Sequence, residues 1–451
     1  MNKEYVIVGG GIAGLFAANA LAKKTNGKVT LVESGEKLGG LLCSFKSKNA
    51  VRYDQGTHLA AKTGVAFIDE ILFEQQGFED NWVSLPYLNA GNYFAGKCNT
   101  QTQVADIRDL NKSLYKQAVA EIMERKPFSS GSFAAYVSSR LGDVVLDELF
   151  IPVVKKLYGD DVDLNELQDN CGYFGLNRVV AFDLDVTKKL KQLDDFDEKI
   201  AFETVHSYAS QSSLNTSFYY PKHKHGIQHW IEKLEKQALE NGVEILLNCQ
   251  TVRLNVSDSE VKTIVLSNGR ILKCDKLVWT IPPYLALKQA DIQFSSESKV
   301  QLMTANVFHF MFDKPITNTK NHYLWNWDAK FKAFRITVYD NFADSFFSGH
   351  RLSVEVLSQA DKSSPSIDDI LRELKEMSLI TADHTVLDQA LQVIHNTFPI
   401  PTKQLALLNQ QISETVKDTL SNVIIGGRHS DKVWTQVDVL KNINEQLDTF
   451  C

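Results

Sequence analysis

The pattern of apolar and polar residues changes twice within the first part of the chain. Residues 5–8 are continuously apolar, residues 9–11 are glycine, and the following residues carry apolar side chains at helical spacing. A second run, residues 28–32, is again mostly apolar and is followed by Glu33. A short apolar run bounded by glycine is typical of a buried strand, so the pattern predicts a strand, a tight turn, a helix and a second strand.

The same alternation of strand and helix patterns returns in the second half of the chain. Residues 227–241 have a helical pattern that ends at a glycine, and residues 243–247 follow as a predicted strand. Residues 267–270 read Ser-Asn-Gly-Arg between two apolar runs, and the Asn-Gly pair predicts a hairpin there. The apolar residues 276–281 end at two prolines, which predicts a buried strand that stops at this point.

The regions between and after these blocks have a different character. Residues 65–200 contain helical stretches and a charged region, which predicts an inserted, largely helical domain. Strand and helix patterns are mixed from 295 to 395, and the last block reads as helix, strand, glycine turn and helix. The predicted helices of these regions are 111–125, 142–158, 367–377 and 405–420, and the charged region is 188–198. The predicted strands are 301–312, 331–339, 351–357 and 422–425.

The first glycine turn predicts a specific ligand. Gly9 allows a sharp turn, Gly11 allows the backbone to approach a pyrophosphate, and Gly14 allows the helix to pack on the sheet. Glu33 is placed to accept hydrogen bonds from a ribose diol, and the helix amino terminus favours phosphate. These features together predict an adenine dinucleotide site, and the alternative is an α/β turn without a ligand.

Composition narrows the classes of protein and partner. A chain of 451 residues suggests two or three domains, and a net charge of −7 argues against a general nucleic-acid binder. The six cysteines lie far apart without a CxxC pair, so we expect neither a zinc site nor a disulfide framework. The start of the chain and the length of its apolar runs predict a cytoplasmic protein with no transmembrane segment.

Further motifs resemble those of one family. Residues 36–40 form a second glycine motif, residues 53–58 read Tyr-Asp-Gln-Gly-Thr-His, and residues 219–222 read Tyr-Tyr-Pro-Lys. Residues 422–428 form an apolar strand that ends in Gly-Gly-Arg. Together with the first turn, these segments resemble the flavin-containing amine oxidoreductase superfamily, which includes protoporphyrinogen oxidases, amine oxidases, carotene desaturases and UDP-galactopyranose mutases.

The resemblance implies an α/β fold with FAD as cofactor: a doubly wound, Rossmann-type FAD-binding domain with an inserted α+β substrate domain. The FAD-binding domain is expected to comprise residues 1–65, 205–292 and 396–451, and the substrate domain residues 66–204 and 293–395, with the helical insertion. The residues expected to bind the cofactor are Gly9, Gly11, Ile12, Ala13, Gly14, Glu33, Lys37, Gly39, Gly40, Leu41, Thr57, His58, Val252, Thr280, Gly427, Arg428, Val437 and Asp438.

Departures from the family pattern concern charge near the flavin. Leu41 stands where many members have an arginine, so Arg428 is expected to supply a positive charge instead. No lysine lies between residues 305 and 312, where amine oxidases commonly place one, and this argues against the amine-oxidase subclass. The Gly-Arg end, in place of Gly-Asp, resembles the mutases and related polysaccharide-locus proteins.

Three residues are candidates for catalysis by resemblance, namely His58, Arg335 and Tyr339. For each a structural role is the alternative: a hydrogen bond for His58, and an ordinary half-buried strand for the other two. Trp325 and Trp327 are either an aromatic wall for a substrate or packing residues, and packing is favoured. No metal site is expected, since the His-Lys-His run at 223–225 lacks a third ligand at a convincing spacing.

The leading functional prediction is a two-electron oxidation of a small-molecule substrate through N5 of the flavin. A sugar-nucleotide mutase that uses reduced FAD without net oxidation is the alternative, and a sugar nucleotide or polysaccharide precursor is the corresponding partner. A non-catalytic flavin-fold protein is the third possibility. The oligomeric state, the electron acceptor and any contact of the helical insertion with a membrane or partner stay open.

Overall fold

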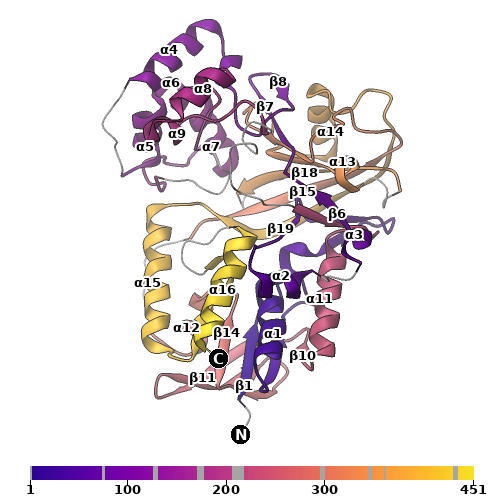
Figure 1. The fold of residues 1–451 in the computed structure, drawn as a ribbon, viewed down its shortest axis with the longest axis vertical. Helices are drawn as coiled ribbons and strands as arrows, with labels where there is room; N and C mark the ends of the chain where they lie inside the picture. Colours follow the sequence, from indigo (N-terminus) through magenta and orange to yellow (C-terminus); the bar gives the residue numbers. More distant parts are fainter. Residues whose placement is uncertain are drawn as a thin grey trace.

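A five-stranded parallel sheet forms the base of the molecule in the computed structural model (Figure 1). The structure describes residues 3–73, 77–124, 131–169, 177–205, 218–294, 300–343, 348–359, 362–429 and 435–450. The strand order is β10-β2-β1-β14-β20, and every neighbouring pair is parallel. The strands are β1 (Glu4–Val8), β2 (Lys28–Val32), β10 (Glu244–Leu246), β14 (Lys276–Trp279) and β20 (Val423–Ile425).

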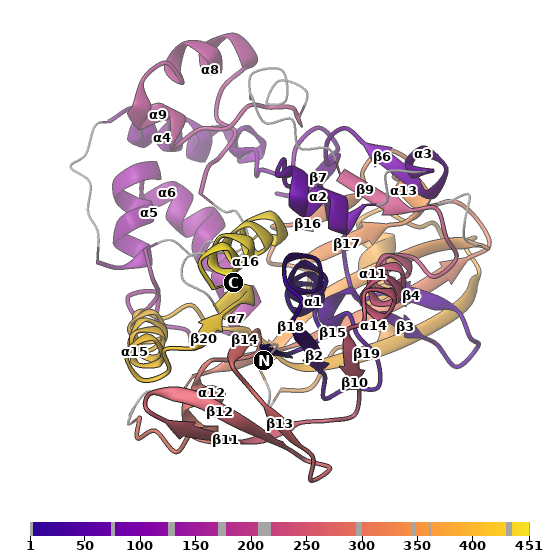
Figure 2. The same ribbon diagram turned by 60° about the horizontal axis from the view of Figure 1, so that its bottom comes forward.

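Both faces of this sheet are covered by other elements. Successive residues of a strand point to opposite faces, and because both sets are apolar here, both faces must be buried. Ile7 packs on one side with helices, whereas Val6 and Val8 pack on the other with a three-stranded antiparallel sheet. Figure 2 shows this small sheet below the parallel one. The covering elements are α1 (Ile12–Lys24), α2 (Ala66–Leu72), α11 (Gln228–Glu240) and α16 (Gln436–Phe450) on the first side, and β11 (Thr251–Ser257), β12 (Glu260–Leu266), β13 (Ile271–Lys273), α12 (Tyr284–Gln289) and α15 (Lys403–Thr419) on the second.

A second, seven-stranded sheet lies above the first, with the order β19-β15-β18-β17-β16-β7-β8 (Figure 1). One face packs against α14 (Ile367–Glu376) through Phe308, Phe310, Val354 and Ile370. The strands are β7 (Ala90–Phe94), β8 (Lys97–Asn99), β15 (Leu302–Phe312), β16 (Tyr323–Asn326), β17 (Arg335–Val338), β18 (His350–Gln359) and β19 (Val386–Pro399).

A helical group packs on part of the other face of this sheet, where Trp325, Trp327 and Leu357 join its core. Ser132 caps α5 by accepting a hydrogen bond from the N–H of Ala135, so this helix begins directly after Ser132. The helices are α4 (Lys112–Met123), α5 (Phe133–Leu141), α6 (Asp143–Val145), α7 (Ile151–Tyr158), α8 (Leu184–Leu190) and α9 (Asp194–Asp197), with a π-helical segment at Leu146–Phe150.

Shorter elements join the two sheets. β3 (Ser44–Lys46) pairs with β4 (Arg52–Asp54), and β9 (Phe218–Pro221) lies between β5 (Ala60–Ala61) and β6 (Trp82–Leu85). Ile68 and Trp82 pack into the same core as α1 and α11, although the sequence assigns residues 66–85 to the substrate domain. The domain boundaries themselves stay a prediction.

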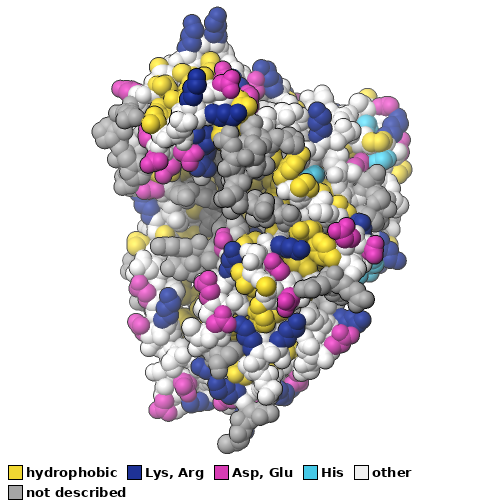
Figure 3. Space-filling model, viewed as in Figure 1, with side chains coloured by type: hydrophobic (Ala, Val, Ile, Leu, Met, Phe, Trp, Pro, Cys, Tyr) yellow, Lys and Arg dark blue, Asp and Glu magenta, His cyan; other side chains and the backbone are white. Residues whose placement is uncertain are grey.

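Acidic and basic side chains are interspersed on the face shown in Figure 3, as the moderate net charge suggests. Within the described ranges, no helix combines the length and the apolar character needed to cross a bilayer.

Most predicted elements are confirmed. The initial strand, helix and strand form β1, α1 and β2, and the Asn-Gly hairpin joins β12 to β13. The strand predicted at 331–339 begins only at Arg335, because residues 327–334 form the preceding loop. The 14-residue strand β19 was not predicted, since much of it is half-exposed and lacks regular apolar alternation.

Candidate functional site

The carboxyl ends of the parallel strands meet at one edge of the sheet, and the first glycine turn lies there. The N–H of Gly9 donates to the carbonyl of Val32 over 2.9 Å, and the N–H of Gly426 donates to that of Trp279 over 2.8 Å. In open α/β sheets, ligands bind outside this edge. We call it the strand edge below.

The three glycines of the turn differ in what a side chain at their position would meet. A Cβ on Gly9, whose φ is +102°, would lie 2.4 Å from Oγ1 of Thr280, and one on Gly14 would lie 1.9 Å from the carbonyl oxygen of Gly9. A Cβ on Gly11 would meet nothing within 4 Å. Gly9 and Gly14 are therefore required by the protein's own packing, whereas Gly11 leaves open space at the strand edge.

That space adjoins the amino terminus of α1, where Gly11 provides no side-chain cap. The first N–H groups of a helix have no partner within the helix, so this end attracts an anion. Ile12 and Ala13 are the first two residues of the helix. The turn thus fits the pyrophosphate of a dinucleotide by its donors and by the room beside Gly11.

Glu33 follows β2 at the same edge. One carboxylate oxygen accepts a hydrogen bond from the N–H of Gly10 over 2.6 Å, and the other accepts from the N–H of Gly35 over 2.7 Å. These bonds fix the carboxylate beside the glycine turn. Oε1 also accepts from the hydroxyl of Ser34 over 3.1 Å, whereas Oε2 has a further lone pair for a hydroxyl of a ribose.

The second glycine motif lies against the first. The N–H of Gly39 donates to the carbonyl of Gly10 over 2.8 Å, and Nζ of Lys37 donates to the carbonyl of Ser44 over 2.9 Å. Both Gly39 and Gly40 have positive φ, which favours glycine there. The side chain of Leu41 is 42% exposed beside this turn, so it supplies an apolar surface and no charge.

Thr280 and the carboxyl-terminal glycines complete the strand edge. Oγ1 of Thr280 donates to the carbonyl of Val8 over 2.9 Å, and Gly427 has a φ of +74° close to the Thr280 carbonyl. Asp438 instead accepts hydrogen bonds from the N–H and hydroxyl of Thr435 at the start of α16, and Val437 is half-buried in the same turn. Val252 lies on β11 with an exposed side chain, so a contact with adenine would have to involve its backbone.

His58 lies among positive charges that come from distant parts of the chain. Its Nε2 is 3.2 Å from the carbonyl of Gln55, and burial lowers its pKa to about 3, with the charges of Arg335 and Arg428 acting in the same direction. Three predicted residues, from the 53–58 motif, β17 and the turn that follows β20, are thus brought together. The imidazole stays neutral at physiological pH.

Arg335 is held by a carboxylate that sequence analysis missed. Its Nε and Nη2 donate to Oε1 and Oε2 of Glu355 over 2.6 and 2.7 Å. Glu355 also closely approaches Gly56, where an added Cβ would lie 2.9 Å from Oε1. The only signal in the sequence is an isolated acidic residue in the apolar strand 351–357.

Thr57 ties the same loop to β17, since its hydroxyl lies 2.5 Å from that of Thr337. The loop from Gly56 to His58 is therefore positioned by the seven-stranded sheet as well as by its own strand. This contact ties the loop to the seven-stranded sheet beside His58.

Tyr339 is placed differently from His58 and Arg335. It is 1% exposed, and its hydroxyl donates to the carbonyl of Asp54 over 3.3 Å and lies 3.2 Å from Oγ of Ser353. The Asp54 carboxylate accepts a hydrogen bond from the hydroxyl of Tyr220 over 2.7 Å, and burial raises the pKa of Asp54 to about 7. Tyr339 thus belongs to a buried polar network, and its catalytic role stays a prediction.

Two other candidate clusters have structural contacts. The rings of Trp325 and Trp327 stack on each other at 4.9 Å and are buried. His225 and His229 approach Glu232, at 3.0 and 3.5 Å from Nδ1. Among the residues with described positions, no group of three or more His, Cys, Asp or Glu side chains has metal-binding geometry.

Known proteins resemble this chain in sequence. The profile of the flavin containing amine oxidoreductase family matches residues 12–373. The coproporphyrinogen III oxidase of Staphylococcus aureus (strain NCTC 8325 / PS 47) is 25% identical over 278 residues, 58% of this chain and 57% of that protein. The 4,4'-diapolycopene oxygenase of a Methylomonas species is 24% identical over 375 residues, 78% of this chain and 69% of that protein. The match therefore spans only a little over half of the coproporphyrinogen oxidase.

Solved structures resemble it in fold. A reduced UDP-galactopyranose mutase superposes with a TM-score of 0.77 at 17% identity, covering 100% of this chain and 94% of that one. A putative protoporphyrinogen oxidase from Exiguobacterium sp. 255-15 gives a TM-score of 0.71 at 16% identity, covering 100% and 98%. The family match extends over most of the chain, and the strand edge offers the phosphate turn that FAD requires. The chain belongs to the flavin containing amine oxidoreductase family, and its cofactor is FAD.

Proposed function

We propose that this protein is an FAD-dependent oxidoreductase that removes two electrons from a small-molecule substrate. The observation that carries the proposal is the open space beside Gly11 at the uncapped amino terminus of α1. The packing around Gly9 and Gly14 requires those glycines. No described neighbour comes within 4 Å of a Cβ at position 11, so the close approach of a ligand accounts for glycine there. When bound, the flavin supplies the redox chemistry by accepting the two electrons at N5.

The protein's own contribution is orientation and electrostatics. Arg335 and Arg428 bring positive charge towards His58. Positive charge at this place stabilises negative charge that develops during a reaction. Neutral His58 serves as a hydrogen-bonding group, since protonation at neutral pH would work against both arginines. Tyr339 holds the 53–58 segment through its hydrogen bond to the Asp54 carbonyl, which makes it a positioning residue in this proposal.

The substrate classes to consider come from the relatives. A porphyrinogen or a carotenoid fits an oxidation, since related proteins carry the names coproporphyrinogen III oxidase and 4,4'-diapolycopene oxygenase. A sugar-nucleotide mutase is the second candidate. It is favoured by the fold similarity to UDP-galactopyranose mutase and by Arg428 following Gly427 at the strand edge.

The test begins with anaerobic reduction of the bound flavin, after which its absorbance is followed on mixing with air. The oxidised protein is then given coproporphyrinogen III or 4,4'-diapolycopene without oxygen, and the reduced protein is given UDP-galactopyranose. Bleaching by one of the first two supports the oxidoreductase. Turnover of the sugar nucleotide by reduced protein alone supports the mutase, and no reaction in any arm argues against both.

A further inference from the structure

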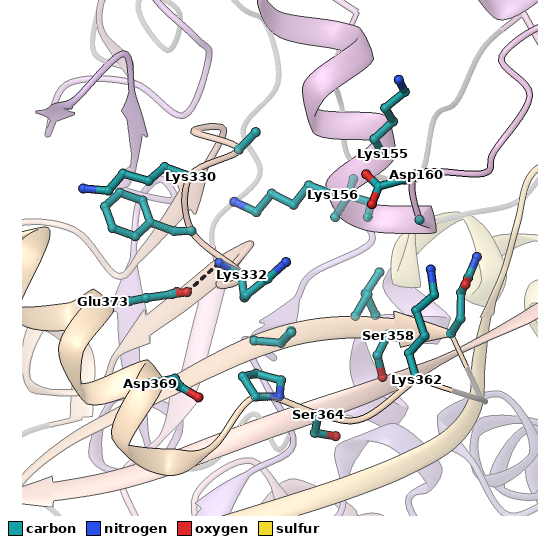
Figure 4. A pocket seen from close by; sticks show the side chains of 18 of the residues that line it. Lys155, Lys156, Asp160, Lys330, Lys332, Ser358, Lys362, Ser364, Asp369 and Glu373 are labelled. Atoms are coloured by element: carbon teal, nitrogen blue, oxygen red, sulfur yellow. Dashed lines mark hydrogen bonds between the residues drawn. The ribbon is translucent and has the colours of Figure 1, made fainter.

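The substrate domain contains a cavity of about 770 Å³ that is separate from the strand edge. Its walls come from α7, the loop between β16 and β17, the end of β18 and one side of α14 (Figure 4). None of the residues that form the glycine turns or surround His58 lines it. Its volume lies within the roughly 300–1,000 Å³ of small-molecule sites.

Basic side chains outnumber acidic ones in this cavity, although the chain as a whole carries a net charge of −7. Figure 4 shows Lys156 extending from α7 towards the loop that carries Lys330 and Lys332, while Lys362 rises from the opposite wall. The basic residues are Lys155, Lys156, Lys330, Lys332, Lys362 and Arg372, and the acidic residues are Asp160, Asp369, Glu373 and Glu376.

Most of the acidic groups are already engaged with the protein. Glu373 accepts hydrogen bonds from the N–H groups of Lys332 and Ala333 over 2.7 and 3.0 Å. Asp369 accepts from the hydroxyl of Ser366 over 2.7 Å in the capping box of α14 and pairs with Arg372 at 3.1 Å. Glu376 pairs with Lys330 at 2.7 Å. These carboxylates therefore fix the walls, and they neutralise the cationic side chains only in part.

Lys156 fastens one wall of the cavity to another. Its Nζ donates to the carbonyls of Asn326 and Asp328 over 2.8 and 2.9 Å, which uses two of the three ammonium hydrogens. Burial lowers its pKa to about 7, so an anion beside it would favour the charged form. The third hydrogen is the one available for such a ligand.

One hydroxyl donor, Ser358, lies on the opposite wall. Oγ of Ser358 accepts a hydrogen bond from Nδ2 of Asn306 over 2.9 Å, so its own hydrogen is available to a ligand. Lys362 has only a distant acidic neighbour among the described residues, Asp161 at 4.0 Å, and is 53% exposed. Ammonium and hydroxyl donors on facing walls match a ligand with several anionic oxygens.

We infer that this cavity binds a phosphorylated small molecule, at a site distinct from that of FAD. Phosphate groups combine concentrated negative charge with many acceptor oxygens, which suits several lysines that approach from different elements. The wall includes Val356 to Gln359, directly after Glu355 on β18, so a bound ligand adjoins the strand that holds Arg335.

The test uses flavin-loaded protein, so that the pyrophosphate site at the strand edge is filled, and inorganic pyrophosphate as probe in isothermal titration calorimetry. Inorganic phosphate is titrated in parallel. The double variant Lys332→Gln/Lys362→Gln removes two charges from exposed side chains, and Lys188→Gln/Lys189→Gln removes two from exposed positions on α8. We expect the first variant to weaken pyrophosphate binding by about tenfold or more, and the second to change it little.

A third variant, Lys156→Gln, is expected to weaken binding as well and to lower stability, because it also releases the loop. Absence of pyrophosphate binding to the wild type, or equal weakening by the two double variants, would overturn the inference. Binding of phosphate and pyrophosphate with equal affinity would indicate a site for a single phosphate group. The readout is the binding of pyrophosphate and not the redox activity of the flavin. The outcome of this test therefore does not depend on the proposed function.

Discussion

Arg335 and Glu355 form a two-point ion pair between β17 and β18, with donor–acceptor distances of 2.6 and 2.7 Å. The Glu355 side chain is 4% exposed and that of Arg335 is 20% exposed. Because Gly56 lies directly against the carboxylate, the pair also sets the position of the loop that carries His58. A single carboxylate thus balances a charge and supports a turn at the candidate flavin site.

Replacing Glu355 with glutamine leaves Arg335 without its counter-charge. We expect a loss of about 2–4 kcal/mol in the free energy of unfolding, since one partner of a buried pair is removed. The uncompensated arginine is also expected to raise the flavin reduction potential. Urea unfolding and a potentiometric titration measure the two effects. Glu240→Gln, at an exposed pair with Lys236, is the control and should cost less than about 1 kcal/mol. Equal effects in both variants would contradict the prediction.

Gly11 and Gly14 offer a matched pair of substitutions. Gly11→Val is expected to keep its circular dichroism and thermal midpoint but to lose bound flavin, because the side chain fills space that only the cofactor uses. Gly14→Ala is expected to destabilise the fold itself, since its Cβ would meet the Gly9 carbonyl. Normal flavin content in folded Gly11→Val protein would show that the pyrophosphate lies elsewhere.

Arg428→Ala is expected to weaken flavin binding by about tenfold, the usual loss for a charge-assisted hydrogen bond. It should also lower the reduction potential, because a positive charge near the reduced flavin is removed. Arg428→Lys separates the two effects: it restores the potential if charge alone matters, and not if the planar fork of donors is needed. Arg270→Ala, at a surface pair with Glu244, is the control. Unchanged binding and potential in Arg428→Ala would assign this arginine to the surface.

The burial of His309 predicts that the free energy of unfolding depends on pH. It is fully buried, its Nδ1 lies 2.8 Å from Oγ of Ser353, and its ring stacks on those of Phe45 and Tyr53; burial lowers its pKa to about 4. Since the unfolded histidine titrates near 6.5, its contribution to stability is full above that pH and falls as the pH drops towards 4.

Over that pH range, His309 is expected to lower the free energy of unfolding by about 3 kcal/mol. His309→Gln should therefore show a smaller fall in urea midpoint between pH 7.5 and pH 5 than the wild type, whereas His395→Gln, at an exposed position, should follow the wild type. A parallel fall in all three proteins would refute the assignment.

Local patterns predicted the elements of the FAD domain well, because glycine turns, apolar runs and the Asn-Gly hairpin each depend on neighbouring residues. The turn at Gly9 and the hairpin at Gly269 both appear where expected, with positive φ. The sheet order was not predictable in the same way, since β14 and β20 join β1 from distant parts of the chain.

Within the candidate site, the motif residues were easier to predict than their supports. His58 and Arg428 lie in recognisable segments, whereas Glu355 acts on Arg335 through a pairing between strands that no short motif records. Tyr339 and Arg335 were both predicted as catalytic residues from the same sequence segment, and both lie in the region of β17. The sequence could not reveal that the tyrosine hydroxyl turns to Asp54 in the interior.

The parallel sheet takes its strands from residues 4–32, 244–279 and 423–425, which sets the timing of assembly during synthesis. A nascent chain already carries the phosphate turn when its first strands leave the ribosome, but Leu277 to Trp279 have no partner on their outer side until β20 emerges. Parallel pairing between such distant segments is slow. We therefore expect FAD to bind only after the last strand has paired, and the exposed edge of β14 to need protection from other chains until then.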